Sequence, residues 1–173
     1  MLKNIRGKLM ATVQKITPSL WFDNNCEEAM TYYTSVFPNS EIILIKRYPE
    51  GITQGPMAGM DGKVLTGIFE LNGQRFMALD GGPLFKFTEA ISFSVDCQTQ
   101  EEIDHYWQNL SAVPEAEQCG WCKDKYGISW QIVPSILGKL MTDEDPEKVG
   151  RVTQAFMSMK KFDIAKLQAA YNG

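Results

Sequence analysis

The sequence carries the same short motifs twice, in the same order, and this duplication limits the possible fold more than any other feature. Each motif of the first half has a counterpart in the second half that keeps its acidic, aromatic or glycine residues in place. The matched segments are 19–23 (SLWFD) with 92–96 (SFSVD), 27–33 with 101–107, and 73–77 with 127–131. Repetition of this kind predicts a chain built from two copies of one supersecondary unit.

Hydrophobic periodicity assigns a similar order of elements to the two halves. The first half is expected to contain a strand at 16–22, a helix at 27–37, a strand at 41–48, and a hairpin formed by 63–71 and 74–79 around Asn72-Gly73. The second half is expected to contain a strand at 90–95, a helix at 99–110, and a hairpin formed by 118–123 and 128–133. No strand is recognisable between Ser111 and Gln118, so the second βαβββ unit has either a very short strand there or none.

Three further segments complete the domain organisation. Residues 1–12 form a partly basic N-terminal extension, and 13–134 form the duplicated domain, with modules at about 16–82 and 89–134. The loop 49–62 contains four glycines and two prolines and could act as a flap. Residues 135–173 form a helical tail. Within it, Asp145-Pro146 is expected to start a helix that runs to about Met159, and Asp163 one that runs to Tyr171.

Composition excludes several classes of function. The formal net charge is −4 and no basic stripe is present, which argues against a nucleic-acid partner. No apolar run approaches the roughly 20 residues that span a bilayer, so no membrane association is expected. Without a signal peptide, the chain is expected to be cytoplasmic, with its four cysteines reduced.

Several blocks of the sequence resemble one family in particular. The blocks are ITP at 16–18, WF at 21–22, EA at 28–29, YY at 32–33, NGQ at 72–74, ALDGGP at 78–83, FKF at 85–87, EAISF at 89–93, YW at 106–107, CGW at 119–121, KD at 123–124, and SWQIVP at 129–134, with MKK at 159–161 and DI at 163–164 in the tail. They are similar to the PhnB-like proteins, often labelled 3-demethylubiquinone-9 3-methyltransferase-like. This family is a branch of the vicinal oxygen chelate superfamily, which includes glyoxalases, extradiol dioxygenases and bleomycin-resistance proteins.

The resemblance implies an α+β fold, in which tandem βαβββ modules form a cupped mixed sheet that is followed by C-terminal helices. It also implies where a metal would bind, because glyoxalase-like relatives use one His or Glu from each of four strands. Those positions fall here on Thr17, Met77 (or Ala78), Ala90 and Gln131. Thr, Met and Ala cannot form a shell for a hard cation, and Gln is a weak neutral ligand. We therefore expect neither a metal nor another cofactor.

The methyltransferase label is not supported by the sequence itself. A doubly wound methyltransferase would show a glycine-rich turn between its first strand and a helix, whereas Gly81-Gly82 leads to Pro83. The label is therefore interpreted as inherited nomenclature. Asp80, at the end of a predicted strand, is a candidate general base, a rim acid or simply a turn-former, and Asp-Gly favours the turn.

Cysteine and histidine offer little further chemistry. Cys119-x-x-Cys122 is expected on a strand rather than at the helix N-terminus that would activate a thiol, and Cys26 and Cys97 do not complete a zinc set. Cys122 is interpreted as a small hydrophobic core residue. The single histidine, His105, is expected on a helix surface.

Strand alternation then selects the side chains that would line the cup. They combine aromatic walls with a few hydrogen-bonding groups: Thr17, Ser19, Trp21, Met77, Phe87, Ser92, Trp121 and Gln131. The leading hypothesis is a homodimeric protein that binds a small, partly apolar molecule without metal. An enzyme in the same cup, either metal-dependent or a methyltransferase, and an interaction protein with a filled cup remain the alternatives.

Overall fold

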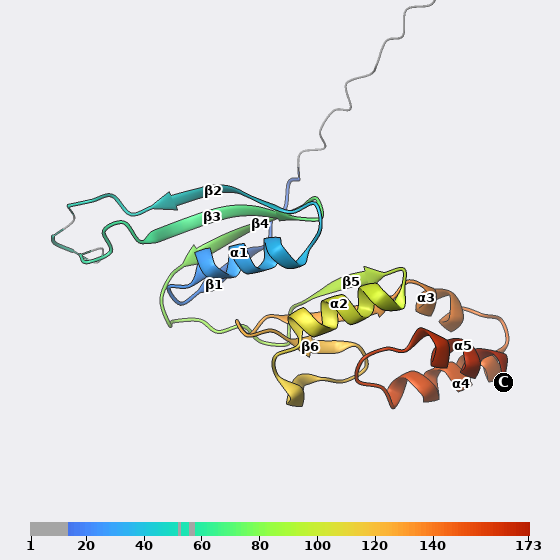
Figure 1. Cartoon of the computed structure of the whole chain (residues 1–173). Helices are drawn as coiled ribbons and strands as arrows, with labels where there is room; N and C mark the ends of the chain where they lie inside the picture. The colour runs from blue at the N-terminus through green and yellow to red at the C-terminus, as the bar shows by residue number, and fades with distance from the viewer. Residues whose placement is uncertain (1–13, 52, 56–57) are drawn as a thin grey trace, which may run out of the picture. The chain divides into compact units, whose positions relative to one another are not determined.

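The computed structural model describes residues 14–51, 53–55 and 58–173. The predicted N-terminal extension lies outside the described residues, as do positions 52, 56 and 57 of the proposed flap. The chain divides into two compact units (Figure 1). The first unit contains residues up to 20 together with 24–80, and the second contains 21–23 and 81–173.

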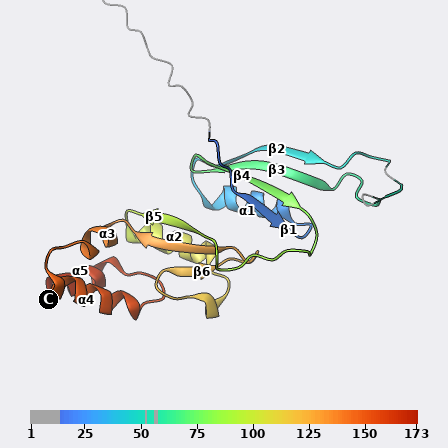
Figure 2. The same cartoon turned by 180° about the vertical axis from the view of Figure 1, so that it is seen from behind.

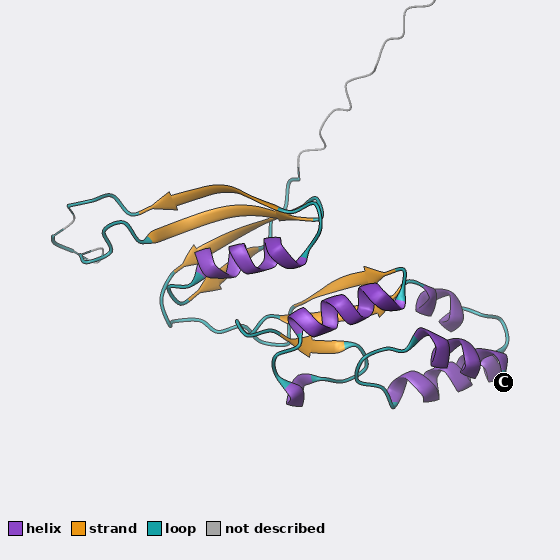
Figure 3. Cartoon of the chain, in the orientation of Figure 1, coloured by secondary structure: helices purple, strands orange, loops and turns teal. Residues whose placement is uncertain are grey.

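The first unit is a four-stranded mixed sheet with one helix on one of its faces (Figure 3). Its elements are β1 (Ser19–Phe22), α1 (Cys26–Val36), β2 (Glu41–Arg47), β3 (Val64–Leu71) and β4 (Gln74–Asp80), and the strand order is β1-β4-β3-β2. Helix α1 packs against β2, β3 and β4 through a buried stripe that includes Met30 and Tyr33. Gly67 lies directly beneath Met30, where a Cβ atom would come within 2.4 Å of the Met30 sulfur.

The β3–β4 hairpin confirms the strongest turn signal of the sequence. Asn72 and Gly73 both have positive φ angles, 47° and 82°, as a two-residue type I′ turn requires. The strands then pair from Leu71 opposite Gln74 to Thr66 opposite Leu79 without a register shift. This regular pairing fixes which side chains of β4 face α1 and which face away from it.

The second unit contains a three-stranded sheet covered by one helix and followed by the tail (Figure 2). Its elements are β5 (Ser92–Cys97), α2 (Gln100–Leu110), a 3₁₀ helix (Pro114–Ala116), β6 (Trp121–Lys123) and β7 (Ser129–Pro134), with strand order β5-β7-β6 and β5 parallel to β7. The 3₁₀ helix occupies the segment where a strand was not recognisable. Strand β5 was predicted two residues too early, because Ala90 and Ile91 are exposed and lie outside the sheet.

The tail folds into α3 (Ile136–Met141), α4 (Pro146–Met157) and α5 (Ile164–Asn172). The predicted caps are confirmed, since the Asp145 and Asp163 carboxylates accept hydrogen bonds from the Glu147 and Lys166 N–H groups. Helix α4 ends two residues before the predicted Met159. Helix α3 was not predicted, because six residues are too few to show a clear period.

The turn at Cys119 and Gly120 binds the segment between α4 and α5 by hydrogen bonds to its backbone carbonyl oxygens. The N–H groups of Cys119 and Gly120 donate to the carbonyl oxygens of Met159 (2.8 Å) and Lys160 (2.7 Å). Gly120 has φ +82°, and a Cβ atom there would lie 2.3 Å from the ring of Phe162. A glycine is therefore required at 120 for both its backbone angle and this close approach.

Candidate functional site

In the first unit, the face of the sheet opposite α1 carries several predicted binding residues. Along β4, Phe76 and Ala78 are buried toward α1, whereas Met77 points to the other face and is 37% exposed. Ile68 pairs with Met77 and Leu44 pairs with Ile68, so these aliphatic side chains continue across the sheet. Ser19 lies at the start of β1 and is exposed. This face is therefore mainly aliphatic.

Thr17 precedes β1 and is tied to β4 by its neighbours. The Met77 N–H donates to the Pro18 carbonyl oxygen (2.9 Å), and the Gln14 side-chain amide donates to the carbonyl oxygen of Arg75 (3.0 Å) and to Thr17 Oγ1 (3.5 Å). These hydrogen bonds join the residues before β1 to β4, and so place Thr17 and Ser19 beside Met77 within the first unit.

Trp21 contacts the glycine pair Gly81-Gly82, and Phe87 follows this pair in the sequence. The Trp21 indole N–H donates to the carbonyl oxygen of Gly82 (2.9 Å), and its ring meets Phe85 edge-on at 4.9 Å. Because the indole N–H already has a protein acceptor, Trp21 can offer a ligand only the face of its ring. Phe87 is half-buried and packs edge-on against Phe22 at 5.4 Å.

In the second unit, the face of the sheet opposite α2 is polar and aromatic. The Gln131 side-chain amide donates to Ser92 Oγ at 2.8 Å, and Trp121 is the direct cross-strand partner of Gln131. Lys123 pairs in the same way with Ser129. Trp130 and Ile132 are buried on the α2 side of the same strand. The structure therefore brings the predicted residues Ser92, Trp121 and Gln131 together on one face.

Asp80 has a role that the sequence did not indicate. It is only 6% exposed, and its Oδ1 accepts a hydrogen bond from the Cys26 N–H at 2.9 Å, in the first turn of α1. The N-cap residue Asn25 makes no side-chain bond of its own, so a carboxylate from β4 supplies the cap. The sequence suggested a general base, a rim acid or a turn-former at Asp80, and none of these is a helix cap. A pairing across 54 positions leaves no local signal in the sequence.

The residues at the predicted metal positions do not fit a hard cation. Ala90 lies outside β5, and Gln131 is engaged with Ser92, which leaves a neutral amide–hydroxyl pair. Within the part of the chain that the structure describes, no cluster of three or more His, Cys, Asp or Glu side chains could hold a metal ion. His105 is exposed on α2, where its ring meets that of Tyr106.

Three of the four cysteine thiols are buried and inert. Burial raises the pKa of Cys26, Cys97 and Cys122 to about 12, and the neighbouring Asp80 carboxylate adds to the effect at Cys26. The expectation that the Cys-x-x-Cys pair lies on a strand is only half right. Cys122 lies in β6, but Cys119 precedes it in a left-handed turn with φ 49°.

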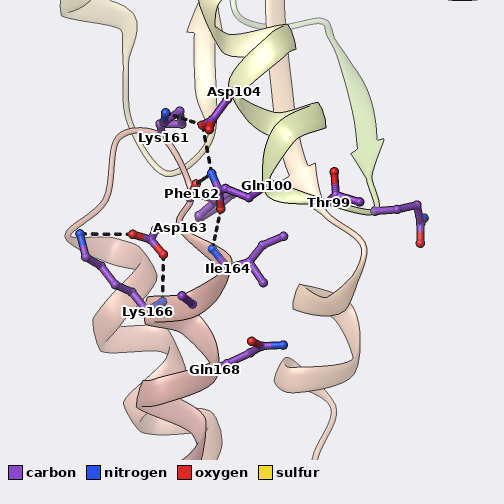
Figure 4. Close-up of a pocket in the computed structure, with 11 residues that line it drawn as sticks. Thr99, Gln100, Asp104, Lys161, Phe162, Asp163, Ile164, Lys166 and Gln168 are labelled. Atoms are coloured by element: carbon purple, nitrogen blue, oxygen red, sulfur yellow. Dashed lines mark hydrogen bonds and ion pairs between the residues drawn. The ribbon is translucent and has the colours of Figure 1, made fainter.

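A cavity of about 600 Å³ lies where the N-terminal ends of α2 and α5 meet (Figure 4). The Gln100 amide donates to the Phe162 carbonyl oxygen (3.1 Å) and accepts from the Ile164 N–H (2.9 Å). Asp104 accepts from both Gln100 and Lys161. The charged groups here are paired with one another, and Gln100 ties α2 to the segment that leads into α5.

The chain is similar to a known family and to several solved structures. Residues 14–133 match the family described as 3-demethylubiquinone-9 3-methyltransferase. A structure from Bacillus cereus, provisionally described as a 3-demethylubiquinone-9 3-methyltransferase, PhnB protein, is 43% identical, with a TM-score of 0.58 over 70% of this chain and 99% of its own. Protein PA1353 from Pseudomonas aeruginosa is 20% identical, with a TM-score of 0.51 over 70% of this chain and 97% of its own, and shares the fold. A Staphylococcus aureus protein is 33% identical, with a TM-score of 0.32 over 68% and 93% of the two chains. No curated protein matches the chain.

Two sheets, of four and three strands and each with a helix on one face, define an α+β protein of glyoxalase-like fold. The chain belongs to the PhnB-like family, whose model bears the 3-demethylubiquinone-9 3-methyltransferase name. The family match ends at residue 133, so helices α3, α4 and α5 lie beyond it. No helix among the described residues has the length and apolar character needed to cross a membrane.

Proposed function

We propose that this PhnB-like protein binds a small, partly apolar molecule on the face of the three-stranded sheet opposite α2, and that it does so without a catalytic metal. The observation that carries the proposal is the neutral Gln131–Ser92 pair beside Trp121. An aromatic side chain next to a few fixed hydrogen-bonding groups is typical of small-molecule sites. Homodimer formation and a cytoplasmic location belong to the same proposal, as does the domain organisation predicted from the sequence.

The first test is the metal content of the untagged protein, measured by mass spectrometry after purification without chelators. We expect far less than one metal ion per chain. One divalent ion per chain would overturn the metal-free proposal. A thermal-shift screen of small aromatic and aliphatic compounds then tests binding, and Gln131→Leu should abolish any shift while Ser35→Ala, at an exposed position of α1, should not.

A second candidate function is the methyl transfer that gives the family its name. The description of the Bacillus cereus relative favours it, since that chain is 43% identical to this one. Methyl transfer requires a methyl donor, so titration with S-adenosylmethionine in a calorimeter tests it directly. Saturable binding with one site per chain would favour the methyltransferase, and no heat of binding would favour the binding protein. An interaction protein with a filled cup would give no thermal shift with either set of compounds.

A further inference from the structure

Ser129 presents an unusual hydroxyl group. The residue is 2% exposed, and its Oγ is the one buried side-chain polar atom without a hydrogen-bond partner among the residues that the structure describes. A buried polar group without a partner destabilises a protein, and such groups are rare in native structures. Sites that depart from this rule are often functional.

The neighbours of Ser129 are hydrogen-bond donors. Its partners in the sheet register are Ser92 on β5 and Lys123 on β6, so the three side chains share one face. The Ser92 Oγ already accepts from Gln131, which leaves its own O–H free to donate outward. The Lys123 ammonium forms an ion pair with Glu89, so its charge is already balanced.

The ring of Trp121 provides an aromatic surface near Ser129. Trp121 lies opposite Gln131, two residues from Ser129 along β7 and on the same face. Diagonal neighbours of this kind are separated by about 7–8 Å. A planar ring placed on Trp121 would therefore carry a substituent into the neighbourhood of Ser129.

We propose that Ser129, with Ser92 beside it, forms an oxygen-binding subsite for a ring-containing ligand that bears a neutral carbonyl oxygen. The hydroxyl groups supply the donors, and Trp121 contacts the ring. A neutral oxygen is favoured over a carboxylate because Glu89 already neutralises Lys123 and would repel a second anion. This inference rests on the proposed binding function, and it names the class of ligand.

Three probes of nearly equal size separate the possibilities: acetophenone (neutral carbonyl), benzoate (carboxylate) and ethylbenzene (no oxygen). Their affinities are measured by NMR titration of the full chain, following the signals of Trp121, Ser129 and Gln131. We expect acetophenone to bind about tenfold more tightly than ethylbenzene, as one hydrogen bond predicts. Ser129→Ala should remove that difference, and Ser35→Ala, at an exposed position of α1, should preserve it.

The failures of the subsite and of the binding function have different signatures. Equal affinities for acetophenone and ethylbenzene, unchanged in Ser129→Ala, would overturn the subsite while leaving the binding function intact. Tighter binding of benzoate would overturn the neutral-oxygen assignment. Absence of any shift on this face with all three probes would overturn both.

A second measurement does not depend on any probe. Because Ser129→Ala removes a buried hydroxyl without a partner, it should raise the melting temperature of the free protein by roughly 2–4 °C. Ser94→Ala, at an exposed position, should leave the melting temperature unchanged. A fall in the melting temperature of Ser129→Ala would show that the hydroxyl has an internal partner, and would overturn the subsite.

Discussion

Replacing Gly120 with alanine should weaken the attachment of the tail and lower the stability of the second unit. Gly120 has φ +82°, and an added Cβ atom would lie 2.3 Å from a Phe162 ring carbon and 2.9 Å from the Ile132 carbonyl oxygen. The left-handed angle costs a non-glycine residue about 1–2 kcal/mol. Overpacking adds about 1–3 kcal/mol, because the Ile132 carbonyl is backbone and cannot rotate away.

The two contributions together predict a loss of about 2–5 kcal/mol in the free energy of unfolding. Gly127 provides a matched control, since it has φ +90° but its nearest neighbour for an added Cβ is Phe87 at 3.9 Å. Gly127→Ala therefore carries only the backbone strain, about 1–2 kcal/mol. For a chain of this size the difference between the two variants corresponds to roughly 4–8 °C in melting temperature.

Urea denaturation followed by circular dichroism measures both free energies, and limited proteolysis reports on the tail. We expect Gly120→Ala to be cleaved after Met157 more rapidly than either the wild type or Gly127→Ala. Equal destabilisation of the two alanine variants would refute the reasoning, because it would show that Phe162 does not restrict position 120.

Three further predictions concern other contacts. Asp80→Ala should lower stability by about 1–2 kcal/mol in thermal or urea unfolding by removing the cap of α1, whereas Asp80→Asn, which keeps an acceptor oxygen, should cost less; equal losses would contradict the capping role. Iodoacetamide at pH 8 should label the native protein at Cys119 alone, because burial raises the pKa of the other three thiols to about 12; mass spectrometry that finds two or more labels would contradict this. The hydrogen bond from Lys161 lowers the pKa of Asp104, so this carboxylate stabilises the fold above its ordinary pKa, and the stabilisation is lost as the pH falls through the lowered value. Asp104→Asn and the wild type should therefore differ in melting temperature at pH 7 and converge in acid, and a constant difference would contradict the assignment.

Local signals in the sequence predicted most of the fold. The Asn72-Gly73 turn, the Asp145 cap and the Asp163 cap each depend on residues a few positions apart, and all three form as predicted. The duplication predicted two similar units, and the antiparallel pairing of β3 with β4 follows from the hairpin turn.

Contacts between distant segments could not be predicted in the same way. Asp80 caps a helix that begins 54 positions earlier, and the missing partner of Ser129 becomes visible only when three strands are placed in register. In the candidate site, alternation along β7 placed Gln131 and Ser129 on the face opposite Trp130. It could not show that Gln131 would bond to Ser92, because that contact requires the parallel pairing of β5 and β7.

The attachment of the tail has a consequence for how freely its sequence can change. The N–H groups of Cys119 and Gly120 donate to carbonyl oxygens, which every amino acid possesses, so these two bonds do not depend on which residues occupy 159 and 160. The side chain of Lys160 adds an ion pair with Glu117 that does depend on its identity. The family match covers residues 14–133, so the anchored segment lies beyond it. A tail of different sequence would keep these two backbone hydrogen bonds, whereas the close approach to Gly120 depends on the Phe162 side chain.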